Sequence, residues 1–175
     1  MEHAGTLVGS RVFASVIPVT LALLGVVIAN LPVSFLGGFV PAPLLGLMPI
    51  YFWGLVRPDL MPPFWAFAAG VLEDVLSGGP PGVWTVSFIV TFALIDRQRD
   101  AFAGLAGVWA ILGFATAATL CCATAYTVEA LIFWRLPPFA PVMGELAMSV
   151  IFYVLIAMFF GFIQRRLVGP LRGDF

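Results

Sequence analysis

The chain has 175 residues, of which 62% are apolar and 10% are charged, whereas a soluble domain has about 45–50% apolar and about 25% charged residues. This composition excludes a soluble globular domain, because so few charged residues cannot cover the surface of a core this apolar. It also excludes a disordered chain, which is poor in apolar residues and rich in charge. With a net charge of −1 and no lysine, the chain offers no basic surface for nucleic acid. We therefore expect an all-α integral membrane protein with residues 1–175 in a single transmembrane domain.

Six apolar segments follow one another along the chain, separated by residues that end a membrane helix. A helix needs about 20 mostly apolar residues to cross the hydrocarbon core of a bilayer. Proline, glycine and charged residues mark the breaks, as in Arg57-Pro58-Asp59 and in the glycine- and proline-rich sequence 77–82. The predicted spans are approximately 12–31, 42–56, 60–76, 83–95, 106–128 and 146–163. The segments 32–41, 96–100 and 134–145 are predicted to be loops.

The arginine residues are distributed unevenly between the two sides of such a six-span arrangement. Seven of them fall on one side, namely Arg11, Arg57, Arg97, Arg99, Arg165, Arg166 and Arg172. Only Arg135 falls on the other side. Because positively charged loops stay in the cytoplasm, both termini are predicted to be cytoplasmic and the loop 134–145 periplasmic. The count is the same if 60–76 and 83–95 form a re-entrant hairpin, so the arginines leave both arrangements open.

The ionisable and nucleophilic residues do not form a pattern that catalysis would need. The one histidine, His3, lies at the N-terminus, and the adjacent Cys121 and Cys122 lack the spacing of a metal or redox pair. The sequence contains no H-E-x-x-H, Walker A or G-x-G-x-x-G motif. We therefore expect no catalytic, cofactor-binding or metal-binding residues, and a protein that is not an enzyme.

Three acidic residues are predicted to lie towards the outer side of the membrane. Asp74 lies about 21 Å along a helix that begins at residue 60, and Glu129 and Glu145 flank the loop that contains Arg135. A charge within a span is costly, so Asp74 is expected to have a functional or architectural role. It lies one turn before the sequence 77–82, where its carboxylate can accept hydrogen bonds from backbone amides of the turn or of the next helix.

For Glu129 and Glu145 two interpretations stay open. One is a polar site for a partner or a solute. The other, which we favour, is that both side chains lie at helix ends and reach the lipid headgroups.

Small residues recur at every fourth position of the fifth span, at Gly113, Ala117, Cys121 and Ala125. Such a row lets helices approach closely in lipid, so we expect a helix-packing surface within the subunit or between subunits. The tryptophans are expected mostly to face lipid or the membrane interface. They are Trp53, Trp65, Trp84, Trp109 and Trp134.

Two short sequence blocks between residues 41 and 82 carry a resemblance to a known family. The first is Pro49-Ile-Tyr-Phe-Trp53, which leads to Arg57-Pro58, and the second runs from Phe67 to Gly82. The second is similar to the pattern of glycine, two aliphatic residues, aspartate and a Gly-x-Pro-x-Gly turn found in the bacterial rod shape-determining protein MreD family. The resemblance implies structural or partner-binding roles for Arg57, Pro58, Gly70, Asp74, Gly78, Pro80 and Gly82. Glu129 and Glu145 are further candidates on the same predicted outer side as Asp74.

The resemblance to the MreD family also implies a function. Members are non-enzymatic inner-membrane subunits of the bacterial cell-elongation machinery. They associate with the bitopic membrane protein MreC and, through it, with MreB filaments and the peptidoglycan polymerase and transpeptidase pair. The implied fold is a compact bundle of about six transmembrane helices, similar to the substrate-binding subunits of vitamin importers.

That similarity provides the alternative function, a small-solute-binding or transport subunit, because short segments around a glycine-proline break often line a solute site. A closed pocket that converges on Asp74 and Glu129 would favour the solute. An apolar outer groove would favour a partner helix.

Overall fold

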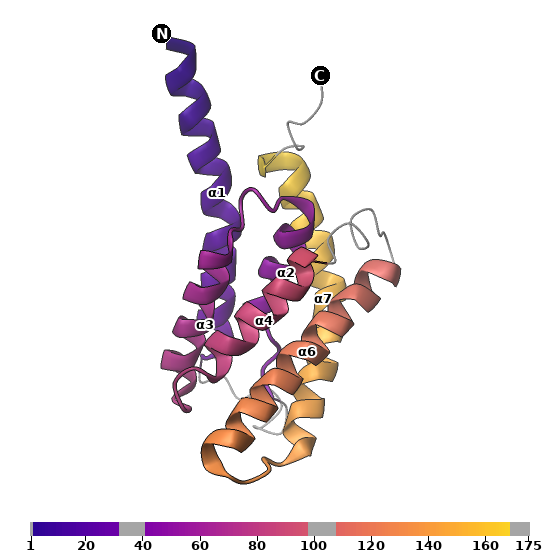
Figure 1. The fold of residues 1–175 in the computed structure, drawn as a ribbon. Helices are drawn as coiled ribbons and strands as arrows, with labels where there is room; N and C mark the ends of the chain where they lie inside the picture. Colours follow the sequence, from indigo (N-terminus) through magenta and orange to yellow (C-terminus); the bar gives the residue numbers. More distant parts are fainter. Residues whose placement is uncertain (1, 32–40, 98–107, 169–175) are drawn as a thin grey trace.

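The computed structural model describes residues 2–31, 41–97 and 108–168, and every regular element in these ranges is helical (Figure 1). The elements are α1 (Glu2–Ala29), α2 (Leu47–Val56), α3 (Pro63–Ser77), α4 (Val83–Arg97), α6 (Val108–Phe133), α7 (Phe139–Ile163) and the π-helical turn η2 (Gln164–Val168). The prediction of an all-α protein is confirmed. Two helical stretches, Trp109–Phe133 and Phe139–Arg166, are long and apolar enough to cross a membrane.

The helices run alternately up and down, and α2 lies among the others. The start of α1 and the turn η2 lie at one end of the molecule, while the α3–α4 turn and the α6–α7 loop lie at the opposite end (Figure 1). Helix α2 contacts α1, α4, α6 and α7, and α4 packs between α3 and α6. This arrangement brings the glycine-proline turn and the α6–α7 hairpin, which are far apart in the sequence, to the same end.

Aromatic side chains fill the core around α2. Phe114 and Tyr153 stack with their ring centroids 4.0 Å apart, and Tyr51 meets both rings edge-on at 5.4 and 5.6 Å. These arrangements are the ones that aromatic quadrupoles favour. The small residues Gly113, Ala117, Cys121 and Ala125 are all buried, so the predicted packing row lies within the subunit.

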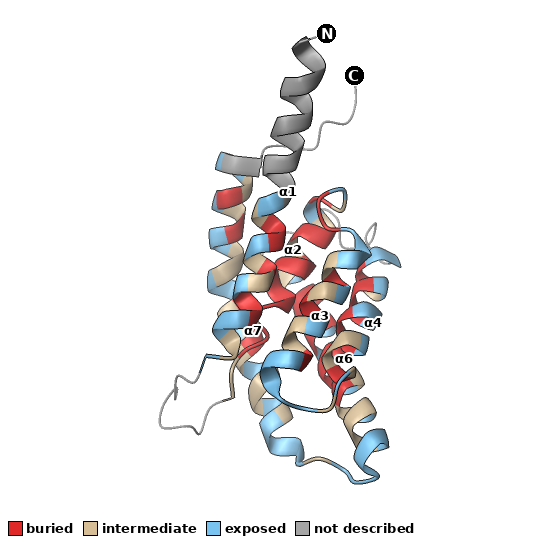
Figure 2. Ribbon diagram, turned by 90° about the vertical axis from the view of Figure 1, so that its left-hand side faces the viewer, coloured by how far each residue is buried: buried red, intermediate tan, exposed pale blue. Residues whose placement is uncertain are grey.

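Exposed residues lie on the outward faces of the helices, and buried residues lie on the faces that pack against other helices (Figure 2). Large apolar side chains are exposed on α1, α3, α4, α6 and α7, with examples in Leu24, Val75, Ile89, Leu112 and Met158. Buried polar or charged residues are Arg57, Asp74, Ser87, Thr91 and Ser149. A soluble monomer rarely exposes apolar patches larger than a few hundred Å². Apolar surface on five helices therefore favours an apolar surrounding.

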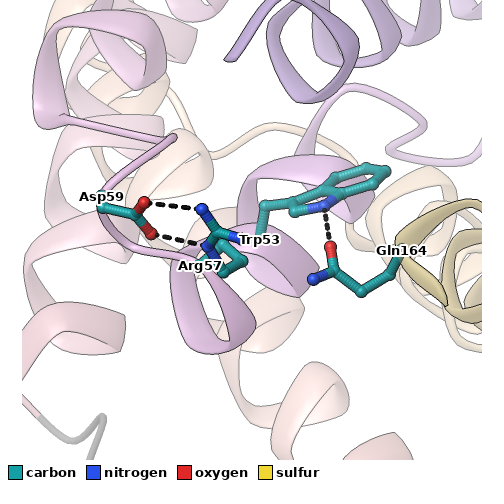
Figure 3. Close-up of polar contacts among 4 residues, drawn as sticks. All are labelled: Trp53, Arg57, Asp59 and Gln164. Atoms are coloured by element: carbon teal, nitrogen blue, oxygen red, sulfur yellow. Dashed lines mark hydrogen bonds and ion pairs between the residues drawn. The ribbon is translucent and has the colours of Figure 1, made fainter. Parts of the chain in front are cut away.

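The five tryptophans differ in exposure, and Trp65 and Trp84 are half-buried. Trp109 and Trp134 are 64% and 88% exposed, as expected for side chains that face lipid or an interface. Trp53, in contrast, is completely buried, and its indole N–H donates a hydrogen bond to Gln164 Oε1 at 3.0 Å (Figure 3). The expectation of a lipid-facing or interfacial side chain was wrong for Trp53, because a polar partner on η2 lets the indole enter the core with its N–H satisfied.

The second predicted span, 42–56, is only partly helical. Helix α2 begins at Leu47, and residues 41–46 form a non-helical segment between α1 and α7. Pro41 and Pro43 explain the difference, because proline disfavours helical backbone in the residue before it and lacks an amide N–H.

Contacts with α1 and α7 hold this segment in place. The Leu44 N–H donates a hydrogen bond to Ser149 Oγ at 2.8 Å, and the Ser149 hydroxyl donates one to the Glu145 carbonyl at 2.6 Å. A Cβ atom at Gly25 would lie 2.5 Å from the Leu45 carbonyl oxygen, so glycine is needed for the close approach of α1. Non-helical backbone can lie at membrane depth when protein surrounds it in this way.

Most other predicted spans differ from the helices at their ends. Helix α1 covers 2–29 instead of 12–31, and α3 begins at Pro63 instead of residue 60 because Pro63 is well suited to the first helical position. Helix α4 matches the span 83–95 closely. Helix α6 extends to Phe133, beyond the predicted end at 128. Residues 106–107 and most of the predicted loops 32–41 and 96–100 lie outside the described residues.

Helix α7 begins at Phe139, seven residues before the predicted start at 146, so the predicted loop 134–145 is much shorter. Pro138 occupies the N-cap position, and Pro141 is tolerated because amide groups of the first turn have no intrahelical partner. Glu145 is therefore a residue of α7 and does not belong to a loop.

Gly70 allows the closest approach of α3 to α4. A Cβ atom at this position would lie 2.6 Å from Thr85 Cα and 3.0 Å from the Trp84 carbonyl oxygen, which are both backbone atoms. A side chain at residue 70 must therefore push the two helices apart. The family resemblance selected Gly70 as a structural candidate, and this contact gives it a physical role.

We predict that Gly70→Ala destabilises the protein by about 1–3 kcal/mol, the usual cost of overpacking. Gly161→Ala in α7 is the matched control, because a Cβ atom there has no neighbour within 4 Å. Thermal unfolding in detergent should show a lower midpoint for the Gly70 variant and an unchanged or higher midpoint for the Gly161 variant. Equal midpoints for both variants would contradict the close contact between α3 and α4.

Candidate functional site

The turn between α3 and α4 depends on two glycines in unusual backbone conformations. Gly78 caps the C-terminus of α3 with φ at 66°, and Gly82 precedes α4 with φ at 98°. Residues with a Cβ atom rarely adopt such angles. Pro80 and Pro81 lie between the two glycines and cannot continue the helix. The chain therefore reverses its direction within the five residues from Gly78 to Gly82.

The Asp74 carboxylate binds the start of α4 from the last turns of α3. Its Oδ2 accepts hydrogen bonds from the Gly82 N–H at 2.9 Å and the Thr85 N–H at 3.1 Å, and its Oδ1 accepts one from the Trp84 N–H at 2.8 Å. The Thr85 hydroxyl donates a fourth hydrogen bond to Oδ2 at 2.5 Å. The prediction that Asp74 would bond backbone amides of the turn and the next helix is confirmed.

This network acts as a helix cap that comes from a different helix. The first amide groups of α4 have no intrahelical partner, and the partial positive charge at a helix N-terminus favours an anion. Asp74 is only 7% exposed, so four donors replace the water that its charge would otherwise require. Asp74 therefore joins α3, the turn and α4 into one unit.

Glu73, the neighbour of Asp74, joins α3 to the end of α1. Asn30 Nδ2 lies 2.7 Å from Glu73 Oε1 and 3.0 Å from the Val26 carbonyl oxygen, and it donates to both. The pairing of Asn30 with Glu73 was not predicted from the sequence. A polar Asn30 at the end of an apolar segment was the one signal for it.

A partly open pocket of about 200 Å³ lies between the α3–α4 turn and helices α4, α6 and α7. Its lining includes Glu129 from α6 and Glu145 from α7, together with Pro80 from the turn. The predicted grouping of acids at one end is therefore confirmed for Glu129 and Glu145. Asp74 does not line the pocket, because its carboxylate is directed at the amide groups of α4.

Two aromatic residues in the pocket wall were not predicted as site residues. They are Trp84, which follows the turn in α4, and Tyr126, one helical turn before Glu129 in α6. Trp84 is half-buried and lines the pocket. The position of Trp84 directly after the turn was the one sign in the sequence that it could belong to the site. The sequence does not show that α6 packs against this part of α4.

Arg57 and Pro58 belong to the connection between α2 and α3, which lies away from the α3–α4 turn (Figure 1). Arg57 Nε and Nη2 donate hydrogen bonds to Asp59 Oδ1 and Oδ2 at 2.9 and 2.8 Å (Figure 3). The Arg57 backbone N–H donates to the Trp53 carbonyl oxygen at 2.8 Å. The hydrogen bond with Asp59 raises the pKa of the Arg57 guanidinium above its ordinary value. Arg57 and Pro58 therefore terminate α2 and begin the turn to α3, and the two sequence blocks do not form one site.

Within residues 2–31, 41–97 and 108–168, no three histidine, cysteine, aspartate or glutamate side chains lie close enough to hold a metal ion. Comparisons of the chain with protein-family models, with curated proteins and with solved structures found no match. The interpretation of the site therefore depends on its own geometry and on the sequence blocks.

We predict that Asp74→Ala strongly destabilises the protein, because it leaves three backbone amides near a buried helix start without their acceptor. Each unpaired group costs about 1–3 kcal/mol, and each kcal/mol lowers the unfolding midpoint by about 2–4 °C in a protein of this size. Asp74→Asn should be milder, since it keeps one acceptor oxygen.

Glu73→Gln is the matched control for this prediction, because an amide oxygen can still accept the hydrogen bond from Asn30. The measurement is the yield of monodisperse protein and its thermal unfolding midpoint in detergent. An Asp74→Ala variant as stable as wild type would show that these hydrogen bonds do not hold the hairpin together.

Proposed function

We propose that the protein is a multi-pass subunit of the bacterial inner membrane, in which the helical segments form one membrane bundle with cytoplasmic termini. The support is the apolar surface on α1, α3, α4, α6 and α7, combined with polar side chains buried inside. The two long apolar helices add to this support. The arginine distribution sets the orientation, with Arg165 and Arg166 on the cytoplasmic side and Arg135 on the periplasmic side.

Within this membrane, the protein is a non-enzymatic subunit of the cell-elongation machinery and acts by binding other membrane proteins. The observation that carries this proposal is the Asp74 network, which explains why the second MreD-like block combines an aspartate with a glycine-rich turn. The block then defines a rigid surface at the periplasmic end of the bundle. An MreC-like bitopic protein is the direct partner, and MreB filaments and the peptidoglycan polymerase and transpeptidase pair are reached through it.

The pocket at this end of the molecule is small for a vitamin-sized ligand. Its volume of about 200 Å³ is below the 300–1,000 Å³ or so of pockets that enclose drug-sized ligands. The Asp74 carboxylate also points into the protein, where it accepts hydrogen bonds from backbone amides. A binding surface for protein partners therefore agrees better with this geometry.

We predict that the α6–α7 loop is periplasmic. Leu136, which is 80% exposed in this loop, is replaced by cysteine in a variant with Cys121→Ala and Cys122→Ala. An impermeant thiol reagent should label this cysteine in intact cells whose outer membrane is permeabilised. Arg165→Cys, at the opposite end, is the control and should react only after lysis. The reverse labelling pattern would overturn the orientation.

We predict that depletion of the protein in a rod-shaped host makes the cells round. The protein purified in mild detergent should retain an MreC-like partner, and Asp74→Asn at wild-type expression should retain less of it than Glu73→Gln does. Normal cell shape on depletion, together with stoichiometric retention of a vitamin or other small solute, would instead support the importer alternative.

A further inference from the structure

The pocket between the α3–α4 turn and the α6–α7 hairpin contains two acidic side chains without a basic partner. Glu129 and Glu145 are both half-buried, and neither side chain forms a hydrogen bond or ion pair with another residue that the structure describes. Arg57 pairs with Asp59 at the opposite end of the molecule, and Arg135 is exposed on the loop. The pocket therefore contains two carboxyl groups that no described side chain pairs with.

A third acidic side chain, Glu73 on α3, interacts electrostatically with Glu145. Carboxylates that are partly removed from water are costly unless a positive group or hydrogen-bond donors compensate them. A cation in the pocket would supply that compensation, whereas an anion would be excluded.

The other lining residues indicate which kind of cation fits. A metal ion would need several oxygen, nitrogen or sulfur ligands, and no suitable group of three side chains exists among the described residues. The pocket instead has two aromatic rings, from Trp84 and Tyr126, whose faces attract an organic cation. Val83 and Val142 add apolar wall that suits a carbon chain.

We propose that this pocket binds a primary ammonium group on a short carbon chain, as found in the ethanolamine headgroup of a phospholipid or in free ethanolamine. Glu129 and Glu145 bind the ammonium group, and Trp84 and Tyr126 cover it. The volume of about 200 Å³ holds several waters at about 30 Å³ each and therefore accommodates such a group. Binding at this site does not depend on the proposed role in cell elongation.

Asp74 is a positioning residue for the pocket. The hydrogen bond from the Trp84 N–H to Asp74 Oδ1 fixes the backbone that carries the indole, and Asp74 Oδ2 holds Gly82 at the end of the turn that provides Pro80. The aspartate of the sequence block therefore places one wall of the pocket without touching what binds there.

The test compares the full-length wild-type protein with the double variant Glu129→Gln and Glu145→Gln, which removes both charges and keeps the side-chain shapes. One arm counts retained phosphatidylethanolamine and phosphatidylglycerol by native mass spectrometry after reconstitution with equal amounts of both. The other arm titrates free ethanolamine by ligand-observed NMR. We expect wild type either to retain phosphatidylethanolamine in preference to phosphatidylglycerol or to bind free ethanolamine. That binding should be at least tenfold weaker in the double variant.

Two further variants separate loss of the site from loss of the fold. Asp96→Asn, at the other end of α4, is the carboxylate control and should bind like wild type. Val142→Phe narrows the pocket without changing its charge and should weaken binding while the protein stays monodisperse. Preference for phosphatidylethanolamine identifies a lipid as the source, and saturable ethanolamine binding alone identifies a free amine. Equal results for wild type and the double variant with both probes would overturn the proposal.

Discussion

The hydrogen bonds of the Asp74 carboxylate are the interaction on which the α3–α4 hairpin depends. A single side chain on α3 provides the acceptor for the amide groups of Gly82, Trp84 and Thr85 at the start of α4. In water these amides would bind solvent, but the outer faces of this molecule are apolar, and so an internal acceptor is needed. The same interaction holds the turn in one conformation. It therefore converts two short helices into a defined surface at one end of the bundle.

The requirement to satisfy backbone groups without water also explains the break before α2. Pro41 and Pro43 prevent residues 41–46 from extending the helix, and Ser149 on α7 then accepts the hydrogen bond from the Leu44 N–H. Gly25 on α1 provides the space in which this segment lies. The break and the Asp74 cap share one feature, since in both places backbone amides without a helical partner donate to one buried side chain.

Helices that are distant in the sequence form the pocket. Their packing gives its acidic residues a different environment from the one that the sequence predicted. Glu129 and Glu145 looked like helix-end residues that reach the headgroups, because the sequence placed them on either side of a loop. The early start of α7 at Phe139 instead places Glu145 within a helix, and the packing of α4 beside α6 brings Trp84 to the same wall. The end of the bundle that carries the α3–α4 turn therefore also has a small cavity lined by two acidic residues.

The sequence by itself determined the all-helical class, the breaks at Arg57-Pro58 and at 77–82, and the bonding role of Asp74. These features are local, because hydropathy, proline and glycine act on their own segment and Asp74 is only eight residues from Gly82. The tertiary structure alone decided the burial of Trp53 against Gln164, the pairing of Asn30 with Glu73, and the meeting of Glu129 and Glu145 with Trp84. Each of these contacts joins residues that are more than 15 positions apart in the sequence but adjacent in the bundle. Packing between helices determines such contacts. The sequence does not predict them, because these helices are apolar on nearly every face and the pattern does not show which face packs against a neighbour.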